Sequence, residues 1–304
     1  MTRQALLASK QWHTSWTFDF FMFTSDQYSL LDFGNGRRLE RFGPVVLDRP
    51  CPAVEGMPCA DRVRWGEADA RFGDRGSEKE CWSENGEISE RWTIEHEKVR
   101  FELKRTEFGH LGIFPEQSVN WDWIGKQAEG FGAGMKVLNL FAYTGGCTLA
   151  AAAAGAEVVH VDAAKNTVNW ARRNAELSGL AEAPIRWIVD DAAKFVLREV
   201  KRGNRYDAVI LDPPSYGHGA RGEVWRLSKH LEPLLKNCAT LTGGRRQYVL
   251  LTCHTPGYEP ERLGEMLTEV CGDGSGKIAA GSLTIRSVDG REMPSGVFAR
   301  WCAT

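Results

Sequence analysis

Three acidic residues stand at the ends of apolar segments in the second half of the 304-residue chain, and together they suggest a nucleoside site. Asp162, Asp191 and Asp212 each close or follow a short apolar run of strand-like composition. Ligands of open parallel sheets bind beyond the carboxyl ends of the strands, where these carboxylates would meet. Packing does not explain them, because burying an unpaired carboxylate is costly. The pattern predicts a ribose diol at Asp162, an adenine amine at Asp191 and a reaction centre at Asp212.

A glycine turn precedes the first of these acids. The apolar run 137–141 leads into Thr144-Gly145-Gly146 and then into a small-residue helix at 147–154. Glycine at such a turn lets the backbone pass close to a ligand. The G-x-G-x-x-G spacing of dinucleotide sites and a Walker-type lysine are both missing, so no pyrophosphate is expected. A nucleoside without phosphates fits better, S-adenosylmethionine (SAM) foremost; the alternative is an ordinary strand–helix–strand unit whose glycines only close a turn.

Strand-like and helix-like segments alternate from Met135 onward and would position these residues. The alternation predicts a mostly parallel, doubly wound α/β sheet with helices on both faces. Strands are expected at 136–141, 157–161, 185–189, 207–211 and 247–252, and helices at 147–154, 165–178, 192–201 and about 224–241. Two more strand candidates, 282–287 and 297–302, are separated by the turn-prone Asp289-Gly290 and 294–296. They predict an antiparallel hairpin at one edge of the sheet.

Residues 1–110 differ from the rest and predict a small, mostly β domain, followed by a second domain at 111–304. Asn35-Gly36 lies between two strand-like runs and is typical of a tight hairpin turn. A second pair of runs, 91–96 and 98–103, repeats the pattern, whereas 44–86 is rich in Pro, Gly and charge and predicts long connections.

A glycine-rich, aromatic segment joins the two regions. It runs from Phe108 to Gln117 within a junction at 106–123, and it leads into a helix expected at 118–128, with Ser118 as its N-cap. Because it directly precedes the glycine-turn strand, it is expected to fold over a ligand. A plain interdomain connection is the alternative.

The composition is that of a globular protein, with 42% hydrophobic and 26% charged residues. No apolar run approaches the roughly 20 residues of a membrane span, and residues 1–10 lack a signal-peptide core, so a cytoplasmic location is expected. The eight cysteines form no C-x-x-C pair, which argues against a disulfide framework or a zinc knuckle, and no metal is expected. With a net charge of −2, any RNA-binding surface must be local.

The motif series FAYTGG, Asp162, Asp191-Ala192, DPPS and LTCHT resembles that of class I SAM-dependent methyltransferases. It most resembles the branch that modifies bases of large-subunit ribosomal RNA. The match extends back through GHLGIFPEQ and forward to PSGVFARW, and so covers about residues 105–304. The PUA domain that often begins members of that branch is not recognisable here. The resemblance implies a Rossmann-like methyltransferase sheet, with SAM as cofactor and S-adenosylhomocysteine as product.

The resemblance also implies roles for individual residues. Gly145 and Gly146 would face the methionine part of SAM, Asp162 the ribose and Asp191 the adenine. The cofactor-binding residues it implies are Phe114, Gln117, Phe141, Tyr143, Thr144, Gly145, Gly146, Asp162, Ala163, Asp191, Ala192 and Asp212. The target base would meet Asp212 and Pro213, with Pro214, Ser215 and Tyr216 beside it, and Tyr216 would stack on a base taken out of its helix.

Two mechanisms compete at the target atom. Cys253 resembles the nucleophile of cytosine-5 RNA methyltransferases, in which a thiolate attacks C6 and activates C5. In the second mechanism Asp212 and the Pro213 carbonyl hold an amine, and the methyl group passes directly to nitrogen. Nitrogen-directed enzymes usually place an aromatic residue after the two prolines, whereas this chain has Ser215. Cys253 is also well suited to be a small buried core residue.

The sequence therefore predicts an enzyme that transfers a methyl group from SAM to a base of structured RNA. Ribosomal RNA is the first candidate for that substrate. A SAM-dependent enzyme acting on a protein or a small molecule is the second hypothesis, because the near-neutral charge allows it. The third is a non-catalytic RNA-binding or assembly factor that keeps the fold. No oligomeric state is indicated.

Overall fold

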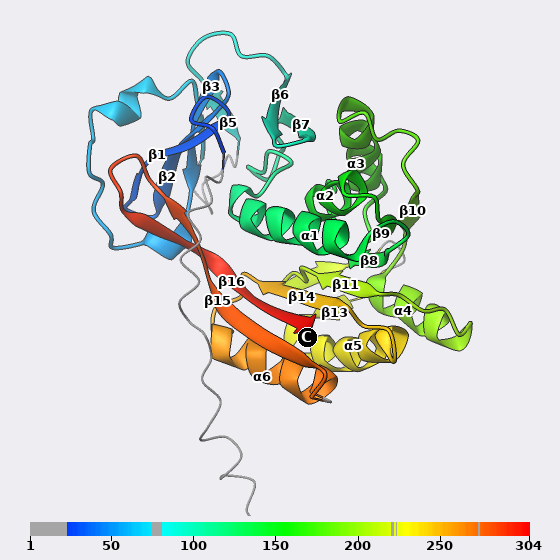
Figure 1. The fold of residues 1–304 in the computed structure, drawn as a ribbon. Helices are drawn as coiled ribbons and strands as arrows, with labels where there is room; N and C mark the ends of the chain where they lie inside the picture. The colour runs from blue at the N-terminus through cyan, green and yellow to red at the C-terminus, as the bar shows by residue number, and fades with distance from the viewer. Residues whose placement is uncertain (1–22, 74–80, 220–221, 223, 273) are drawn as a thin grey trace, which may run out of the picture.

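The computed structural model describes residues 23–73, 81–219, 222, 224–272 and 274–304. An N-terminal β region lies beside a larger α/β region (Figure 1). The first 22 residues of the predicted N-terminal domain, which include the segment 1–10, lie outside the described residues.

The N-terminal region is built on a five-stranded sheet of order β1-β2-β3-β4-β5. Its strands are β1 Tyr28–Gly34, β2 Arg37–Phe42, β3 Val45–Pro50, β4 Ala70–Phe72 and β5 Trp82–Glu84. The β1–β2 hairpin confirms the prediction, and both Asn35 and Gly36 have the positive φ angles, 50° and 73°, that its turn requires. Strands β6 (Arg91–His96) and β7 (Val99–Lys104) form a separate antiparallel pair, again as predicted. Strands β3, β4 and β5 were not predicted, because all three lie in the segment 44–86, whose composition is typical of a connection.

The second sheet has the order β10-β9-β8-β11-β14-β16-β15. Its first five strands are parallel, and β16 and β15 complete it as an antiparallel edge hairpin, which confirms the predicted fold class. The strands are β8 Lys136–Leu140, β9 Glu157–Asp162, β10 Ile185–Val189, β11 Ala208–Leu211, β14 Tyr248–Cys253, β15 Gly276–Arg286 and β16 Glu292–Ala303.

Helices cover both faces of this sheet (Figure 1). Helices α1 (Ser118–Phe131), α2 (Gly146–Ala153) and α3 (Lys165–Leu177) lie on one face. Helices α4 (Ala192–Lys201), α5 (Leu227–Thr242) and α6 (Pro260–Cys271) lie on the other. Alternate residues of each central strand enter two apolar clusters, one with α1 and α2 and one with α4, α5 and α6. Among the described residues, no helix combines the length and apolar character that crossing a bilayer requires.

The β15–β16 hairpin also joins the two regions (Figure 1). Leu30 of β1 forms a parallel bridge with Ser287 near the hairpin turn. Arg291 donates hydrogen bonds to the carbonyls of Phe33 (3.2 Å) and Pro58 (3.0 Å) and pairs with the buried carboxylate of Asp32. The N-terminal sheet is therefore attached to the edge of the larger sheet by backbone and ionic contacts.

Some local expectations were wrong. The helix expected from about 224 begins instead at Leu227, because Val224–Arg226 (β13) pairs with Tyr216–His218 (β12). The segment 294–296, expected as a turn, lies inside β16. Ser118 does not cap α1: a 3-10 turn, Pro115–Gln117, leads straight into the helix, and the buried Ser118 hydroxyl finds no hydrogen-bond partner among the described residues.

Candidate active site

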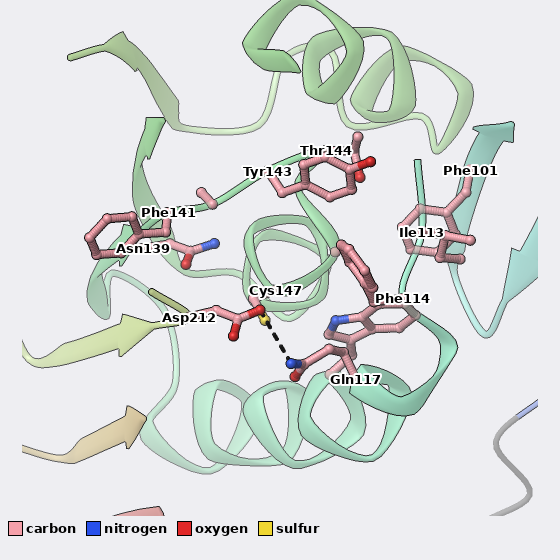
Figure 2. Close-up of a pocket in the computed structure, with 13 residues that line it drawn as sticks. Phe101, Ile113, Phe114, Gln117, Asn139, Phe141, Tyr143, Thr144, Cys147 and Asp212 are labelled. Carbon is pink, nitrogen blue, oxygen red and sulfur yellow. Dashed lines mark hydrogen bonds between the residues drawn. The ribbon is translucent and has the colours of Figure 1, made fainter. Parts of the chain in front are cut away.

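A pocket lies at the carboxyl ends of β8 and β11, between the turn after β8 and the segment that precedes α1 (Figure 2). Aromatic and apolar side chains predominate in it, and Asp212 and Gln117 point toward each other across it (Figure 2). Its lining residues are Phe101, Ile113, Phe114, Gln117, Trp121, Asn139, Phe141, Ala142, Tyr143, Thr144, Gly146, Cys147 and Asp212.

The turn after β8 holds an unusual backbone conformation. Phe141 and Tyr143 have positive φ angles of 56° and 49°, which cost energy in residues other than glycine. Surrounding hydrogen bonds hold this conformation: the Ala142 N–H donates to the Val161 carbonyl (3.1 Å), and the Tyr143 N–H donates to Asp162 Oδ2 (2.9 Å). Strain kept in place beside a pocket is typical of a ligand-binding turn.

The two glycines of the turn are required for space as well as conformation. Gly145 has a φ of 95°, and a Cβ atom there would stand 3.2 Å from the Cβ of Ala171. At Gly146 a Cβ atom would stand 2.6 Å from the indole ring of Trp121, a distance that real Cβ atoms do not show. The turn and the N-terminus of α2 therefore lie directly against α1 and α3.

Asp162 connects the strained turn to the end of β9. Its Oδ2 accepts the Tyr143 N–H and its Oδ1 accepts the Ala164 N–H, both at 2.9 Å. Burial raises its pKa, and the two backbone hydrogen bonds oppose that rise. Each carboxylate oxygen has a second lone pair, so the group is able to accept further hydrogen bonds from a diol.

Asp191 lies outside this pocket lining and begins the next helix. Its Oδ1 accepts the Lys194 N–H at 2.8 Å, which makes it the N-cap of α4. Ala192 is buried behind it, and Ala163 follows Asp162 at the neighbouring strand end. The structure therefore brings Phe114, Gln117, Asp212 and most of the 141–146 turn together in one lining. Gly145, Asp162, Ala163, Asp191 and Ala192 are not part of that lining and stand beside it, in the turn and at the ends of β9 and β10.

Asp212 is the polar centre of the pocket. Its Oδ1 accepts a hydrogen bond from Thr252 Oγ1 at 2.5 Å, and its Oδ2 accepts one from Gln117 Nε2 at 3.3 Å. His254 lies beside it, with Nε2 3.6 Å from Asp212 Oδ1 and 3.3 Å from Gln117 Nε2. The carboxylate is therefore held from the ends of β11 and β14 and from the turn before α1.

The loop after Asp212 is fixed at several points. Pro213 is buried, and the Pro214 carbonyl accepts the indole N–H of Trp225 at 2.7 Å. The hydroxyls of Ser215 and Thr255 lie 2.7 Å apart, which ties this loop to the end of β14. Tyr216 lies in β12 and is 52% exposed, so its ring is accessible to a large substrate.

Cys253 points away from these groups. Side chains alternate along β14, so Cys253 joins Val249 and Leu251 in the apolar cluster with α5 and α6, and it is 1% exposed. Its Sγ accepts the Thr255 N–H at 3.5 Å, and burial raises the pKa of the thiol. Cys253 is not part of the pocket lining.

Several lining residues were missed at the level of the sequence. Asn139 stands inside an apolar strand pattern, where its polar amide is the only signal of a role; its Nδ2 donates to Thr148 Oγ1 at 2.9 Å. Cys147 was assigned to a helix without a role. Phe101, Ile113 and Trp121 come from β7 and the segment around α1, and no local pattern brings them to a strand end.

The residues present suit a nucleoside cofactor without phosphates. Among the described residues that line the pocket there is no Lys or Arg, so none of them would balance the charge of a pyrophosphate. The strained turn, the space kept by Gly145 and Gly146 and the acceptor Asp162 match the needs of an amino acid and a ribose on one ligand. The pocket is therefore a candidate SAM site at the switch point of a doubly wound sheet.

The sequence matches the model of the S-adenosylmethionine-dependent methyltransferase family over residues 70–256, and the chain belongs to this family. It is similar to the crystal structure of the SAM-dependent methyltransferase from Agrobacterium tumefaciens, with 38% identity, a TM-score of 0.86 and coverage of 91% of each chain. The family's cofactor is SAM, as the sequence predicted.

Curated relatives match a shorter part of the chain. Ribosomal RNA large subunit methyltransferase I of Aeromonas hydrophila is 37% identical over 110 residues, which are 36% of this chain and 27% of that protein. Ribosomal RNA large subunit methyltransferase K/L of Shewanella frigidimarina is 32% identical over 139 residues, 45% of this chain and 19% of that protein. The chain thus spans about a quarter or less of the length of these two relatives.

Proposed function

We propose that this protein transfers a methyl group from SAM to a base of large-subunit ribosomal RNA. The observation that carries the proposal is Asp212, held at the strand end beside the SAM-type pocket and followed by a fixed Pro-Pro loop. Two curated relatives are named as methyltransferases of large-subunit ribosomal RNA, which supports this class of substrate. Such a substrate implies a cytoplasmic enzyme, as expected from the sequence.

The proposal gives each group a role. SAM supplies an activated methyl group on a sulfonium centre and leaves as S-adenosylhomocysteine. Asp162 accepts the ribose hydroxyls, Asp191 with Ala192 faces the adenine, and Gly145 with Gly146 leaves room for the methionine part. Asp212, the Pro213 carbonyl and Tyr216 receive the target base at the open side of the same strand ends.

Two routes differ at the target atom. Direct transfer to a base nitrogen needs hydrogen-bond acceptors beside the loop, which Asp212 and Pro213 would supply. Thiolate attack needs Cys253 to leave its apolar cluster and to lose the thiol proton, whereas burial raises the pKa of this thiol. The arrangement supports direct transfer to nitrogen better than attack by Cys253.

A transfer assay tests the function. Purified protein is incubated with SAM that carries a labelled methyl group, together with large-subunit RNA, small-subunit RNA or RNA-free lysate from a strain that lacks the gene. We expect label in large-subunit RNA alone. Label in the RNA-free lysate would instead establish a protein or metabolite acceptor. Salt-dependent RNA binding without any transfer would indicate a non-catalytic RNA-binding factor.

A further inference from the structure

Arg300 of β16 is a buried cation whose place in the fold is not explained by an ion pair. It is 8% exposed, and none of the described residues offers it a carboxylate partner. Burial lowers its pKa to about 10. Its guanidinium lies over the rings of Trp123 and Phe298, at 4.7 and 4.5 Å, and donates to the Val119 carbonyl and to Asn120 Oδ1. A buried unpaired charge is costly, which points to a role for Arg300 in orienting the groups that it contacts.

A chain of hydrogen bonds, each donated toward the pocket, connects Arg300 to Asp212 and His254. An arginine only donates, so the Asn120 atom at 2.6 Å from Arg300 Nη2 must be its carbonyl oxygen. The Asn120 amide then donates to Gln117 Oε1 at 2.7 Å. The Gln117 amide is in turn left to donate to Asp212 Oδ2 and to His254 Nε2, both at 3.3 Å. Each amide orientation follows from the donor before it.

This direction fixes the tautomer of His254. Since the Gln117 amide donates, the His254 Nε2 that it faces must be the unprotonated acceptor. The ring proton therefore sits on Nδ1, which faces the buried carboxylate of Glu116 at 3.9 Å. Glu116 is 4% exposed, and its second oxygen has no hydrogen-bond partner within the part of the chain that the structure describes. Gly296 keeps the space beside the His254 ring open, because a Cβ atom at position 296 would stand 2.7 Å from His254 Nδ1.

We propose that His254 Nε2 is the base that accepts the proton released by the target base, and that Arg300, Asn120 and Gln117 position it. The inference rests on the proposed function. The target N–H takes the place of the Gln117 amide at the single lone pair of His254 Nε2. The target nitrogen then forms a bond to the methyl carbon, the carbon–sulfur bond breaks with its electron pair on sulfur, and the N–H proton moves to His254 Nε2. Glu116 stabilises the resulting imidazolium. His254, with 39% of its side chain exposed, is accessible to a substrate while Asp212 holds the base.

The tautomer is measurable without any RNA. Long-range proton–nitrogen NMR of the S-adenosylhomocysteine complex is expected to show His254 protonated on Nδ1 when neutral. Asn120→Asp keeps the shape and accepts from Arg300 but cannot donate to Gln117, so the Gln117 amide turns and the tautomer changes to Nε2–H. Asn237→Asp is the matched control, because Asn237 donates its amide to the Pro233 carbonyl within α5. Nε2–H in the parent protein, or an unchanged tautomer in Asn120→Asp, would overturn the positioning role.

Transfer to large-subunit RNA tests the base. We expect His254→Asn to lower kcat about 100-fold, as loss of a general base does, with SAM affinity within twofold of the parent. Added imidazole is expected to restore part of kcat in His254→Asn and none in Asp212→Asn. Asn120→Asp should lower kcat about tenfold with little change in KM for SAM. If the parent methylates RNA and His254→Asn keeps the parent's kcat, His254 is not the base, and the proposed function stands. If the parent never methylates RNA, the proposed function itself is wrong.

Discussion

Replacing Asp162 by asparagine tests the assignment of the ribose site with almost no change in shape. In the parent, two carboxylate oxygens accept two backbone N–H groups, from Tyr143 and Ala164, each at 2.9 Å. Asparagine has one oxygen, so one N–H would face an amide donor, and the turn after β8 would lose one of its supports. The cofactor would also lose a charged acceptor for a ribose hydroxyl, worth about 1.5–3 kcal/mol.

We expect SAM affinity to fall by about 2–3 kcal/mol in Asp162→Asn, or about 30- to 150-fold, measured by isothermal titration. Asp207→Asn is the control, because Asp207 is equally an acid that accepts a backbone N–H, from Lys136 at 2.7 Å, but it lies at the opposite end of β11. Asp207→Asn should lose stability and keep its SAM affinity within twofold. Equal SAM affinities for Asp162→Asn and the parent would refute the ribose assignment.

Three further predictions concern pH, packing and the thiol. Burial, with a smaller effect of Arg172, lowers the pKa of His160 to about 3. The unfolded chain therefore binds a proton below about pH 6.5 that the folded chain excludes, so the free energy of unfolding should fall by about 1.4 kcal/mol per pH unit between pH 6 and 4. Urea unfolding measured across this pH range should give a smaller dependence of the free energy of unfolding on pH in His160→Gln than in the parent. Gly146→Ala should lower the free energy of unfolding by about 1–3 kcal/mol and weaken SAM binding, because its methyl group would meet Trp121. Equal urea midpoints and equal SAM affinities in the variant and the parent would contradict this. Finally, RNA containing 5-fluorocytosine should form no covalent adduct with the parent; an adduct that Cys253→Ala lacks would restore the thiolate route.

The second sheet was predictable because its signals are local. Apolar runs that alternate with helical patterns fix the order of strands and helices, and the edge hairpin followed from two late strand-like runs. Several short strands left no such signal. Strand β3 follows a Pro-containing segment, and β12 and β13 are three residues each, so their periodicity is too short to read. The boundary at residue 110 stays a prediction.

The site was only partly predictable. Asp162, Asp212 and the glycine turn lie in sequence patterns that the resemblance covers, and the structure brings the turn and Asp212 into one lining with Phe114 and Gln117. Arg300 and Asn120 lie 180 residues apart, and nothing in either segment indicates their contact. A buried arginine without a carboxylate becomes visible only when the fold is known, and so does the orientation of Gln117 that depends on it.

The central claim is methylation of large-subunit ribosomal RNA, and mass spectrometry of that RNA tests it most directly. Nucleosides and fragments would be compared between a wild-type strain, a strain lacking the gene and the same strain carrying Asp162→Asn. The account predicts that one methylated base of the large-subunit RNA disappears in the deletion strain, stays depleted with Asp162→Asn, and returns with the parent gene. An identical set of methylated bases in the wild-type and deletion strains would contradict it.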